Sequence, residues 1–369
     1  MSEQAVRITK HKLISQSILE GIRNGEIIPG DKLPSESELC RKFDASRSSI
    51  RQAISGLVHE GWLKTQKGVG TFCVLKSRKL SLDIGLVCYF SSSYIFPRIA
   101  RGCDQIAHRR GFHIVLNQSE YDPAREREIL ARLRKRGVDG ILIEPVFDGA
   151  DRSNADLLQE LDQSGIPVVL LDNYFPGRDF TRIALDDLAA GRMVASHLLQ
   201  KGHDRIAILC DTGYFPKRLR RDGALELLTQ KGARPPEEWV LGFEGPVHSG
   251  RAADRLSRFF KAVVELPTAF ICTSDEEAIE VYKAAQARGL KIPEDLSVVS
   301  FDNSSLAEVP GISLTSVDHP GQYMGELATQ VLVERVLNPG VACQTTSLIQ
   351  PRLLERSSVR HMQRPFDGR

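Results

Sequence analysis

From about residue 80 to residue 360, short apolar runs alternate with longer amphipathic segments. The apolar runs are rich in Val, Ile and Leu and have the length of strands: DIGLVCYF, HIVLN, GILIEP, PVVLLDN, RIAL, RIAILCD, AFICTSD, LSVVSFD and LTSVDH. The segments between them, such as PRIARGCDQIAHRRG and REREILARLRKRG, have the length and spacing of helices. Continuous apolar strands separated by helices are typical of parallel sheets covered on both faces. We therefore predict a doubly wound α/β architecture, and its length of about 280 residues predicts two lobes.

The first 75 residues have a different pattern, which predicts three short helices followed by two short strands. In the first helix, apolar residues recur at helical spacing at Leu13, Ile14, Ile18 and Ile22. The second helix would begin after Ser35, because Glu38 three residues later completes a capping box. The third would begin after Ser46 as its N-cap. Its predicted buried stripe consists of Ile50, Ala53, Ile54, Leu57 and Val58.

The segments WLKTQ and TFCV flank KGVG and predict a hairpin, which completes a winged helix-turn-helix over residues 1–75. In such motifs the N-terminal end of the third helix enters the major groove of DNA. Arg47, Ser48 and Arg51 would lie there, opposite the buried stripe, with no carboxylate expected within reach. Arginine can pair bidentately with guanine or phosphate. Lys67 would be presented by Gly68 at the wing tip, because glycine lets the backbone approach DNA closely.

Charge is divided unevenly between these two regions. Residues 1–80 hold 14 Lys and Arg against 8 Asp and Glu, whereas the remainder holds 35 against 39. A basic N-terminal domain favours a polyanionic partner for that domain. The seven cysteines are scattered and form no CxxC pair, so we expect reduced thiols, no zinc site and no cofactor. Because no signal peptide or long apolar run is visible, we expect a cytoplasmic protein.

Polar residues follow several predicted strands of the larger domain. In parallel sheets of this kind, ligands bind beyond the carboxyl ends of the strands. Carboxylates at these ends would accept hydrogen bonds from hydroxyl groups, and an arginine would donate to ring oxygens. The residues at these positions are Glu144, Asp172, Asp275 and Asp302, with Arg220 near the start of a helix. Aromatic residues that could form an apolar platform for a sugar are Phe90, Tyr94, Phe96, Tyr174 and Tyr214.

The run KRLRR, from Lys217 to Arg221, permits two interpretations. Arginines at a helix start attract phosphate, which would favour a phosphorylated effector. The interpretation that we favour is that Arg220 alone points into the cleft and that its neighbours are solvated.

Four segments of the N-terminal domain, LPSESEL, SRSSIRQAI, LVHEGWL and KGVGTF, resemble the DNA-binding domain of the GntR family of transcription regulators, in the same order. The resemblance implies contacts to DNA from the residue after LPSE, from the recognition helix and from the wing tip. Carried onto this chain, and with Ser35 added, the DNA-binding set is Ser35, Ser37, Arg47, Ser48, Ser49, Arg51, Lys67 and Gly68. One departure is Ser37, where many members have arginine or another long polar side chain.

The larger domain resembles the effector domain of LacI-family repressors, which is similar to periplasmic sugar-binding proteins. The resemblance rests on HLLQKGHDRIAIL, RLRRDG, TAFICTSDEEAIEVYKAAQARGLKIPEDLSVVSFDN and ISLTSVDHPGQYMGELA. It implies that an effector binds Asp172, Arg220, Asp275 and Asp302, with Glu144 and His319 at neighbouring positions. Two departures are Ser274, where asparagine is frequent, and His319, where glutamine is frequent. The expected domains are residues 1–75, a linker over 76–81 and an effector domain over 82–360, whose lobes connect near 185 and 315–340.

Together the two resemblances imply a DNA-binding regulator, by default a repressor, whose binding to a pseudo-palindromic operator as a homodimer is controlled by a sugar-like effector. The alternatives are a nucleoside or sugar phosphate as effector, or an activator. An enzyme is a further alternative, but the sequence has no GxGxxG after the first strand, no GxxxxGK[ST], no GxSxG and no HExxH. A solute-binding module for transport is disfavoured by the DNA-binding domain.

Overall fold

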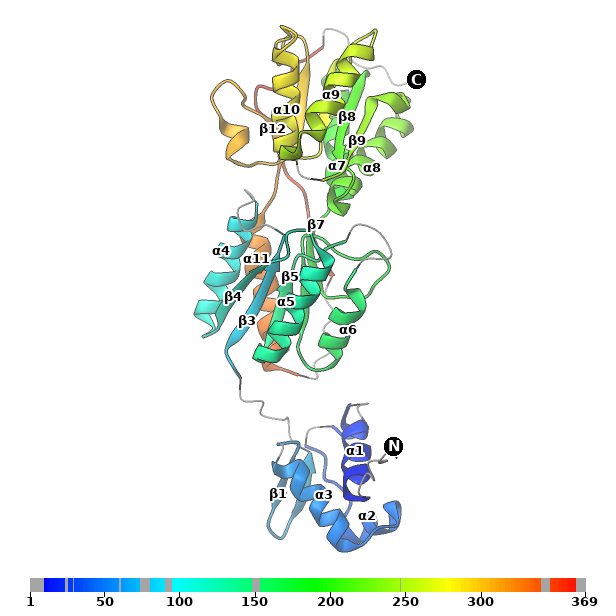
Figure 1. Cartoon of the computed structure of the whole chain (residues 1–369), viewed down its shortest axis with the longest axis vertical. Coiled ribbons are helices and arrows are strands. Elements are labelled where there is room, and N and C mark those ends of the chain that lie inside the picture. The colour runs from blue at the N-terminus through cyan, green and yellow to red at the C-terminus, as the bar shows by residue number, and fades with distance from the viewer. Residues whose placement is uncertain are drawn as a thin grey trace, which may run out of the picture. The chain divides into compact units, whose positions relative to one another are not determined.

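The chain divides into two compact units, Met1–Leu80 and Ser81–Arg369 (Figure 1). The computed structural model describes residues 10–23, 26–28, 30–59, 61–73, 80–89, 95–147, 153–245, 247–339 and 346–362. Most of the predicted linker over 76–81 therefore lies outside the described residues, as do Cys343 and the predicted platform residues Phe90 and Tyr94. The other six cysteines are free thiols.

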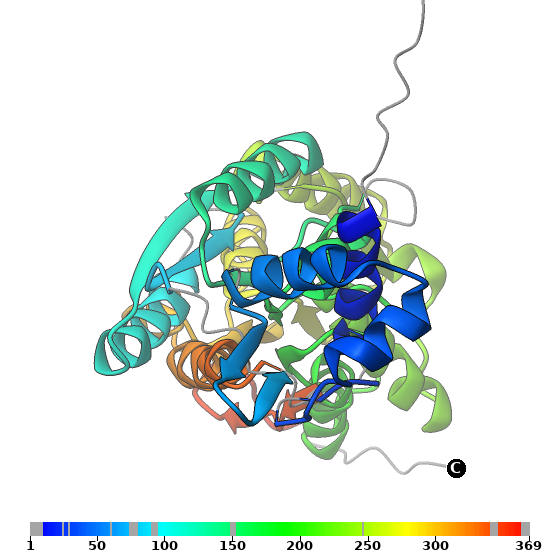
Figure 2. The same cartoon turned by 90° about the horizontal axis from the view of Figure 1, so that it is seen from below.

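The first unit is a winged helix-turn-helix, which confirms the predicted fold (Figure 2). Its elements are α1 (Lys10–Arg23), α2 (Glu36–Phe43), α3 (Arg47–His59), β1 (Leu63–Gln66) and β2 (Gly70–Cys73). The two strands form an antiparallel hairpin, and Lys32 forms an isolated bridge with Phe72.

The local signals in this unit act as the sequence indicates, with one exception. Ser35 and Glu38 form the capping box of α2, and the Ser46 hydroxyl accepts a hydrogen bond from the backbone of Ser49 at 3.2 Å. The α3 stripe is buried from Ile50 to Leu57, whereas Val58 is half-buried. The exception is Leu13, which belongs to the apolar pattern of the predicted helix but has half of its surface exposed, while Ile14 and Ile18 are buried.

The second unit consists of two lobes, each built on a six-stranded sheet. The first lobe contains β3 (Asp83–Cys88), α4 (Phe96–Arg109), β4 (His113–Gln118), α5 (Pro123–Arg136), β5 (Gly140–Ile143), α6 (Ala155–Gln163), β6 (Val168–Leu171), β7 (Arg182–Leu185), α11 (Gly321–Leu337) and β13 (Thr346–Ile349). The second contains α7 (Asp187–Gln200), β8 (Ile206–Asp211), α8 (Phe215–Gln230), β9 (Val240–Phe243), α9 (Arg251–Ala262), β10 (Ala269–Cys272), α10 (Asp275–Gln286), β11 (Ser297–Asp302), β12 (Thr315–Asp318) and β14 (Leu353–Leu354).

The strand orders are β13-β7-β6-β5-β3-β4 and β14-β12-β11-β10-β8-β9. All pairs are parallel except β12 with β14, so the doubly wound parallel architecture is confirmed. The chain passes between the lobes after β7, after β12 and between β13 and β14. The sequence did not predict β9, β13 or β14, because each is short and has no continuous apolar run; these strands need the adjacent sheet to define them.

Two pairs of helices pack at very short range because glycine lies at each contact. α4 and α11 lie side by side in both views, although they are far apart in the sequence (Figures 1 and 2). An added Cβ at Gly102 would come within 2.0 Å of the Gln322 carbonyl oxygen. In the second lobe, α7 and α8 meet in the same way, and a Cβ at Gly191 would come within 2.0 Å of the Arg220 carbonyl oxygen. The approach of α7 to α8 therefore sets the backbone position of Arg220.

Replacing Gly191 by alanine should destabilise the second unit, because the added methyl group has only backbone to meet and one helix must move. We expect a loss of about 2 kcal/mol or more, seen as a fall in melting temperature of roughly 5 °C or more. Gly242→Ala is the matched control, since its Cβ would meet a single side-chain methyl of Thr212 at 3.2 Å. Equal melting temperatures for the two variants would contradict the close helix contact.

Candidate functional site: a DNA-binding surface and an interlobe network

The predicted recognition helix exposes the side chains that the sequence indicates. Arg47, Ser48 and Arg51 are exposed at the N-terminal half of α3, and Ser49 is half-buried. The Ser46 hydroxyl lies 2.8 Å from that of Ser48. Among the described residues, the Arg47 side chain has no hydrogen-bond or ionic partner. This end of α3 therefore offers a cation and short hydroxyl groups, which is the chemistry that phosphate and guanine require.

The expectation that no carboxylate lies within reach of the arginine pair is wrong. Arg51 Nε lies 2.9 Å from a carboxylate oxygen of Glu36 on α2, because the turn between the helices brings α2 against α3. The exposed fractions of the two side chains are 67% and 40%, so solvent screens this pair and it is weak. Within the described part of the chain, the two terminal nitrogens of Arg51 make no hydrogen bond. The fork of Arg51 is thus oriented by Glu36 and still available for DNA.

The remaining predicted contacts are divided between the wing and α2. Lys67 and Gly68 are exposed at the hairpin tip, where Gly68 has a left-handed φ of 80°. Ser37 is exposed on the first turn of α2. The hydroxyl of Ser35 accepts from the Glu38 backbone and donates to its carboxylate, so this side chain is used by the helix cap.

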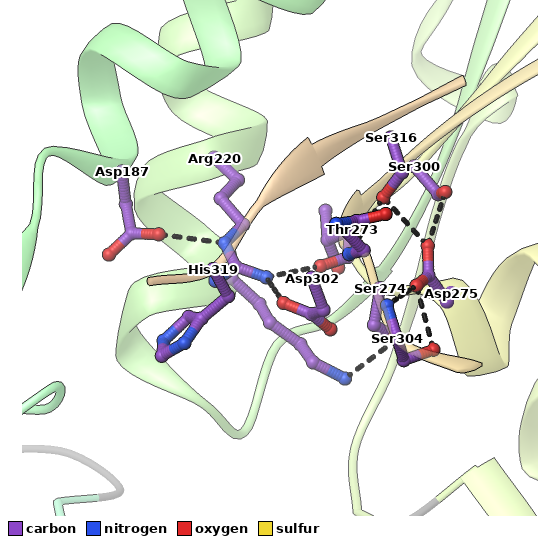
Figure 3. Close-up of polar contacts among 12 residues, drawn as sticks. Asp187, Arg220, Thr273, Ser274, Asp275, Ser300, Asp302, Ser304, Ser316 and His319 are labelled. Atoms are coloured by element: carbon purple, nitrogen blue, oxygen red, sulfur yellow. Dashed lines mark hydrogen bonds and ion pairs between the residues drawn. The ribbon is translucent and has the colours of Figure 1, made fainter. Parts of the chain in front are cut away.

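In the second unit, the centre of the predicted effector site is the buried guanidinium of Arg220 (Figure 3). Its Nε donates to Asp187 at 2.7 Å, and its Nη1 donates to Asp302 at 2.8 Å and to the Thr273 carbonyl oxygen at 2.8 Å. Burial alone would lower the pKa of Arg220, but the two carboxylates outweigh it and raise the pKa further. Among the described residues, its Nη2 has no hydrogen-bond partner.

Asp172, which follows β6, forms a buried ion pair with His319, which follows β12. The Nε2 atom of His319 lies 2.9 Å from Oδ1 of Asp172. Burial opposes the charge on both groups, yet their attraction lowers the pKa of Asp172 to about 2 and raises the pKa of His319. His319 Nδ1 is buried and has no partner among the described residues. The departure from glutamine at this position therefore introduces an ionisable group with a raised pKa between the lobes.

Glu144, which follows β5, joins this network through the hydroxyl of Tyr214. The Tyr214 oxygen lies 2.7 Å from Oε1 of Glu144 and 2.8 Å from Oδ2 of Asp172. Burial and the nearby Asp172 carboxylate raise the pKa of Glu144 to about 8. The structure thus connects Glu144, Asp172 and His319, although the tips of the first-lobe strands are occupied by a tyrosine of this chain.

Backbone strain accompanies the network. Asp172 has φ 58° and Asp302 has φ 99°, in the left-handed region that residues other than glycine rarely adopt. Such conformations cost free energy and persist where the surroundings enforce them, which is typical of functional sites.

Asp187 is the member of the network that the sequence analysis missed. It is the first residue of α7, two positions after the end of β7, and one of its oxygens binds Arg220. The other, Oδ2, is buried without a partner among the described residues. Burial raises the pKa of Asp187 to about 7 against the opposing charge of Arg220. The sequence contained a signal for it, because the predicted strand RIAL is followed by two aspartates.

Two other expectations for this region are not met. Asp275 does not join the Arg220 network: it accepts hydrogen bonds from the hydroxyls of Ser300 and Ser316, at 2.6 and 2.9 Å, and from Ser304 (Figure 3). Its carboxylate thus ties β11, β12 and the following turn together, and burial raises its pKa to about 6. Lys217, predicted to be solvated, is 14% exposed and lies 2.9 Å from the fully buried Glu277.

The aromatic residues that the structure describes also lie differently from expectation. Phe96 is buried at the start of α4, and Tyr174 packs against Arg182 and Phe215 rather than forming an open platform. Tyr214 contacts Tyr89 with ring centroids 5.6 Å apart. Ser274 is fully buried and caps α10 by accepting from Glu277.

The chemistry of the network is that of binding. Carboxylate and hydroxyl oxygens lie beside nitrogen donors, and among the described residues the buried unpartnered atoms of the network are Asp187 Oδ2 and His319 Nδ1. Within the described ranges, no group of three His, Cys, Asp or Glu residues could hold a metal ion. The described helices include none that is long and apolar enough to cross a membrane.

Known proteins resemble both units. Residues 10–73 match the bacterial regulatory proteins of the gntR family, and residues 195–359 match the periplasmic binding protein-like domain. The arabinose metabolism transcriptional repressor of Geobacillus stearothermophilus is 29% identical over 359 residues, which are 96% of this chain and 99% of that protein. The repressor of the same name from Halalkalibacterium halodurans is 27% identical, with 95% and 96% covered.

Among solved structures, a LacI family transcriptional regulator from Mycobacterium smegmatis is similar with a TM-score of 0.64 and 27% identity. The similarity covers 75% of this chain and 99% of that one. Each of the two family matches lies within one of the two units of the structure, and both agree with the predicted resemblances. The chain is therefore a transcription regulator in which a gntR-family DNA-binding domain precedes a periplasmic binding protein-like domain.

Proposed function

We propose that this chain is a repressor whose affinity for its operator is controlled by a neutral, sugar-like effector bound at the Arg220 network. The observation that carries the proposal is the set of polar groups from both lobes near Arg220. Among the described residues, Oδ2 of Asp187 and Nδ1 of His319 are buried there without a partner. Unpartnered buried polar atoms cost free energy, which a hydroxylated ligand would offset by pairing with them.

The charges of the site favour a neutral effector over a phosphorylated one. Each buried cation is already paired with a carboxylate of the chain: Arg220 with Asp187 and Asp302, His319 with Asp172, and Lys217 with Glu277. A phosphate would have to displace these carboxylates or lie beside them, and like charges in a buried site repel strongly. The sugar phosphate alternative therefore has less support than a sugar.

The names of the two relatives support repression and a sugar effector for this chain, since both are repressors of arabinose metabolism. We propose a homodimer in the cytoplasm that binds a pseudo-palindromic operator through two copies of α3. Effector binding would favour one arrangement of the lobes, and a coupling of ~1–3 kcal/mol between the sites would release the DNA. The proposal includes no catalytic step.

A thermal-shift screen tests the effector class. Arabinose, ribose, xylose, cellobiose, glucuronate and ribose 5-phosphate are the probes. We expect a neutral sugar to raise the melting temperature, because a ligand at 100 times its Kd adds about 2.7 kcal/mol to the native state. Stabilisation by glucuronate or ribose 5-phosphate alone would contradict the charge argument.

Two substitutions should separate the two activities. Arg47→Ala should abolish binding to a DNA fragment that the wild-type chain selects from a random library, and should leave the sugar-induced thermal shift unchanged. Asp302→Asn removes the negative charge that pairs with Arg220. This variant should lose the thermal shift while DNA binding persists. Asparagine tolerates the left-handed backbone at this position. Loss of both activities in either variant would show that the two sites are not separate.

Replacing Glu144 by glutamine should flatten the pH dependence of stability. The folded chain holds the Glu144 proton to about pH 8, whereas the unfolded chain loses it near the ordinary glutamate pKa of 4.5, so stability falls as pH rises between these values. The slope attributable to this group is up to about 1.4 kcal/mol per pH unit. The melting temperature of Glu144→Gln should thus fall less than that of the wild type from pH 7 to pH 9. Glu160→Gln, on the exposed face of α6, is the control and should behave as the wild type.

A further inference from the structure

The segment Gly213–Phe215 of the second lobe is held by aromatic residues of the first lobe. Tyr121 donates its hydroxyl to the Gly213 carbonyl oxygen at 2.7 Å. The ring of Tyr214 packs edge-on against Tyr89, with centroids 5.6 Å apart. Phe215 packs edge-on against Phe147 and Tyr174, at 5.6 and 5.2 Å. We call Gly213–Phe215 the latch segment, because these contacts join the two lobes.

The strongest contacts of the latch segment are polar. The Tyr214 hydroxyl lies within hydrogen-bond distance of both Glu144 and Asp172, which follow neighbouring strands of the first lobe. One phenol has one proton, so two ionised carboxylates could not both be satisfied by it. The raised pKa of Glu144 resolves this, because a protonated Glu144 donates to the Tyr214 oxygen while Tyr214 donates to ionised Asp172. Both carboxyl groups are then paired in the absence of any ligand.

The backbone that presents Tyr121 is strained. Glu120 and Tyr121 have φ values of 53° and 63°, two consecutive residues in the left-handed region. Neither residue is glycine, so this turn is costly and must be maintained by its contacts. The bond from Tyr121 to the latch segment is one of these contacts.

We propose that the Tyr214 hydroxyl is an internal substitute for an effector hydroxyl: it occupies the position between Glu144 and Asp172, and the effector binds there by displacing it. The inference rests on the proposed function of the same site and adds a means of regulation to it. The latch segment closes the lobes in the effector-free chain. The free energy that the effector gains on binding must therefore exceed the free energy that is lost when these contacts break.

The proposal also defines the ligand more closely. The group that replaces the Tyr214 hydroxyl must accept from protonated Glu144 and donate to Asp172, whose oxygens lie 2.7 and 2.8 Å from the Tyr214 oxygen. A hydroxyl group of a sugar has this chemistry, whereas a carboxylate or phosphate would meet Asp172 as a like charge. The displaced phenol would leave the ring of Tyr89 open to the apolar face of a sugar.

Tyr214→Phe tests the latch because it removes the hydroxyl and retains the ring. The first measurement is hydrogen exchange by mass spectrometry on the full, effector-free chain, which requires no ligand. Peptides that cover the latch segment and Tyr121 should exchange at least several-fold faster in Tyr214→Phe than in the wild type. Tyr282→Phe is the matched control, since the Tyr282 hydroxyl donates to the Ile312 carbonyl oxygen at 2.6 Å within the second lobe.

The second measurement is the dissociation constant for arabinose and ribose by calorimetry. If the Tyr214 hydroxyl competes with the sugar, the Kd of Tyr214→Phe should be about tenfold or more lower than that of the wild type. The Kd of Tyr282→Phe should be unchanged. A higher or equal Kd in Tyr214→Phe would overturn displacement, because Tyr214 would then contact the effector or contribute nothing. Tyr121→Phe provides a second variant, in which the same peptides should again exchange faster.

The two measurements distinguish the failure of this proposal from the failure of the proposed function. If neither sugar binds any variant, the sugar effector is wrong, and the exchange rates still decide whether the latch exists. Unchanged exchange in both Tyr214→Phe and Tyr121→Phe would overturn the latch whatever the sugars do.

Discussion

The burial of one guanidinium determines the architecture of the proposed effector site. A buried charge is costly unless it is paired, and Arg220 is 1% exposed, so it requires carboxylates on both sides. Asp187 comes from the start of α7 and Asp302 from the end of β11, and the glycine contact at Gly191 brings α7 close enough to α8 for this. Their arrangement around Arg220 depends on the packing of two helices and a sheet. A small change in that packing would be transmitted to the site, since close-packed elements move as units.

Around this centre the protein combines two kinds of electrostatic surface. In the DNA-binding domain, Arg47 and Arg51 are exposed, and the carboxylate beside Arg51 orients it without burying it. In the second unit, Arg220 and His319 are buried and paired with carboxylates, and we propose that they orient a neutral ligand. We thus propose that exposed arginines contact DNA in one domain and that a buried arginine contacts a neutral ligand in the other. Exposure distinguishes the two uses.

Much of the fold follows from the sequence because its signals are local. The capping box at Ser35 and the apolar runs of the parallel sheets are examples. The rule that ligands bind beyond strand ends also selected Glu144 and Asp172, which the structure connects through Tyr214, and Asp302, which binds Arg220. It could not separate Asp275 from them, because a carboxylate that binds serines of neighbouring strands has the same sequence pattern. The pairing of Arg51 with Glu36, and the reach of Tyr214 across the lobes, depend on tertiary packing and have no local signal.

The central claim is that one small ligand in the second unit controls DNA binding by the first. It is tested most directly by measuring the affinity for a labelled operator by fluorescence anisotropy, at constant salt, while arabinose or another stabilising sugar is added. A coupling of ~1–3 kcal/mol corresponds to a fall in DNA affinity of about 5- to 150-fold, and the reciprocal loss of sugar affinity on DNA must be equal. A DNA affinity that stays constant when the sugar site is saturated would contradict the account.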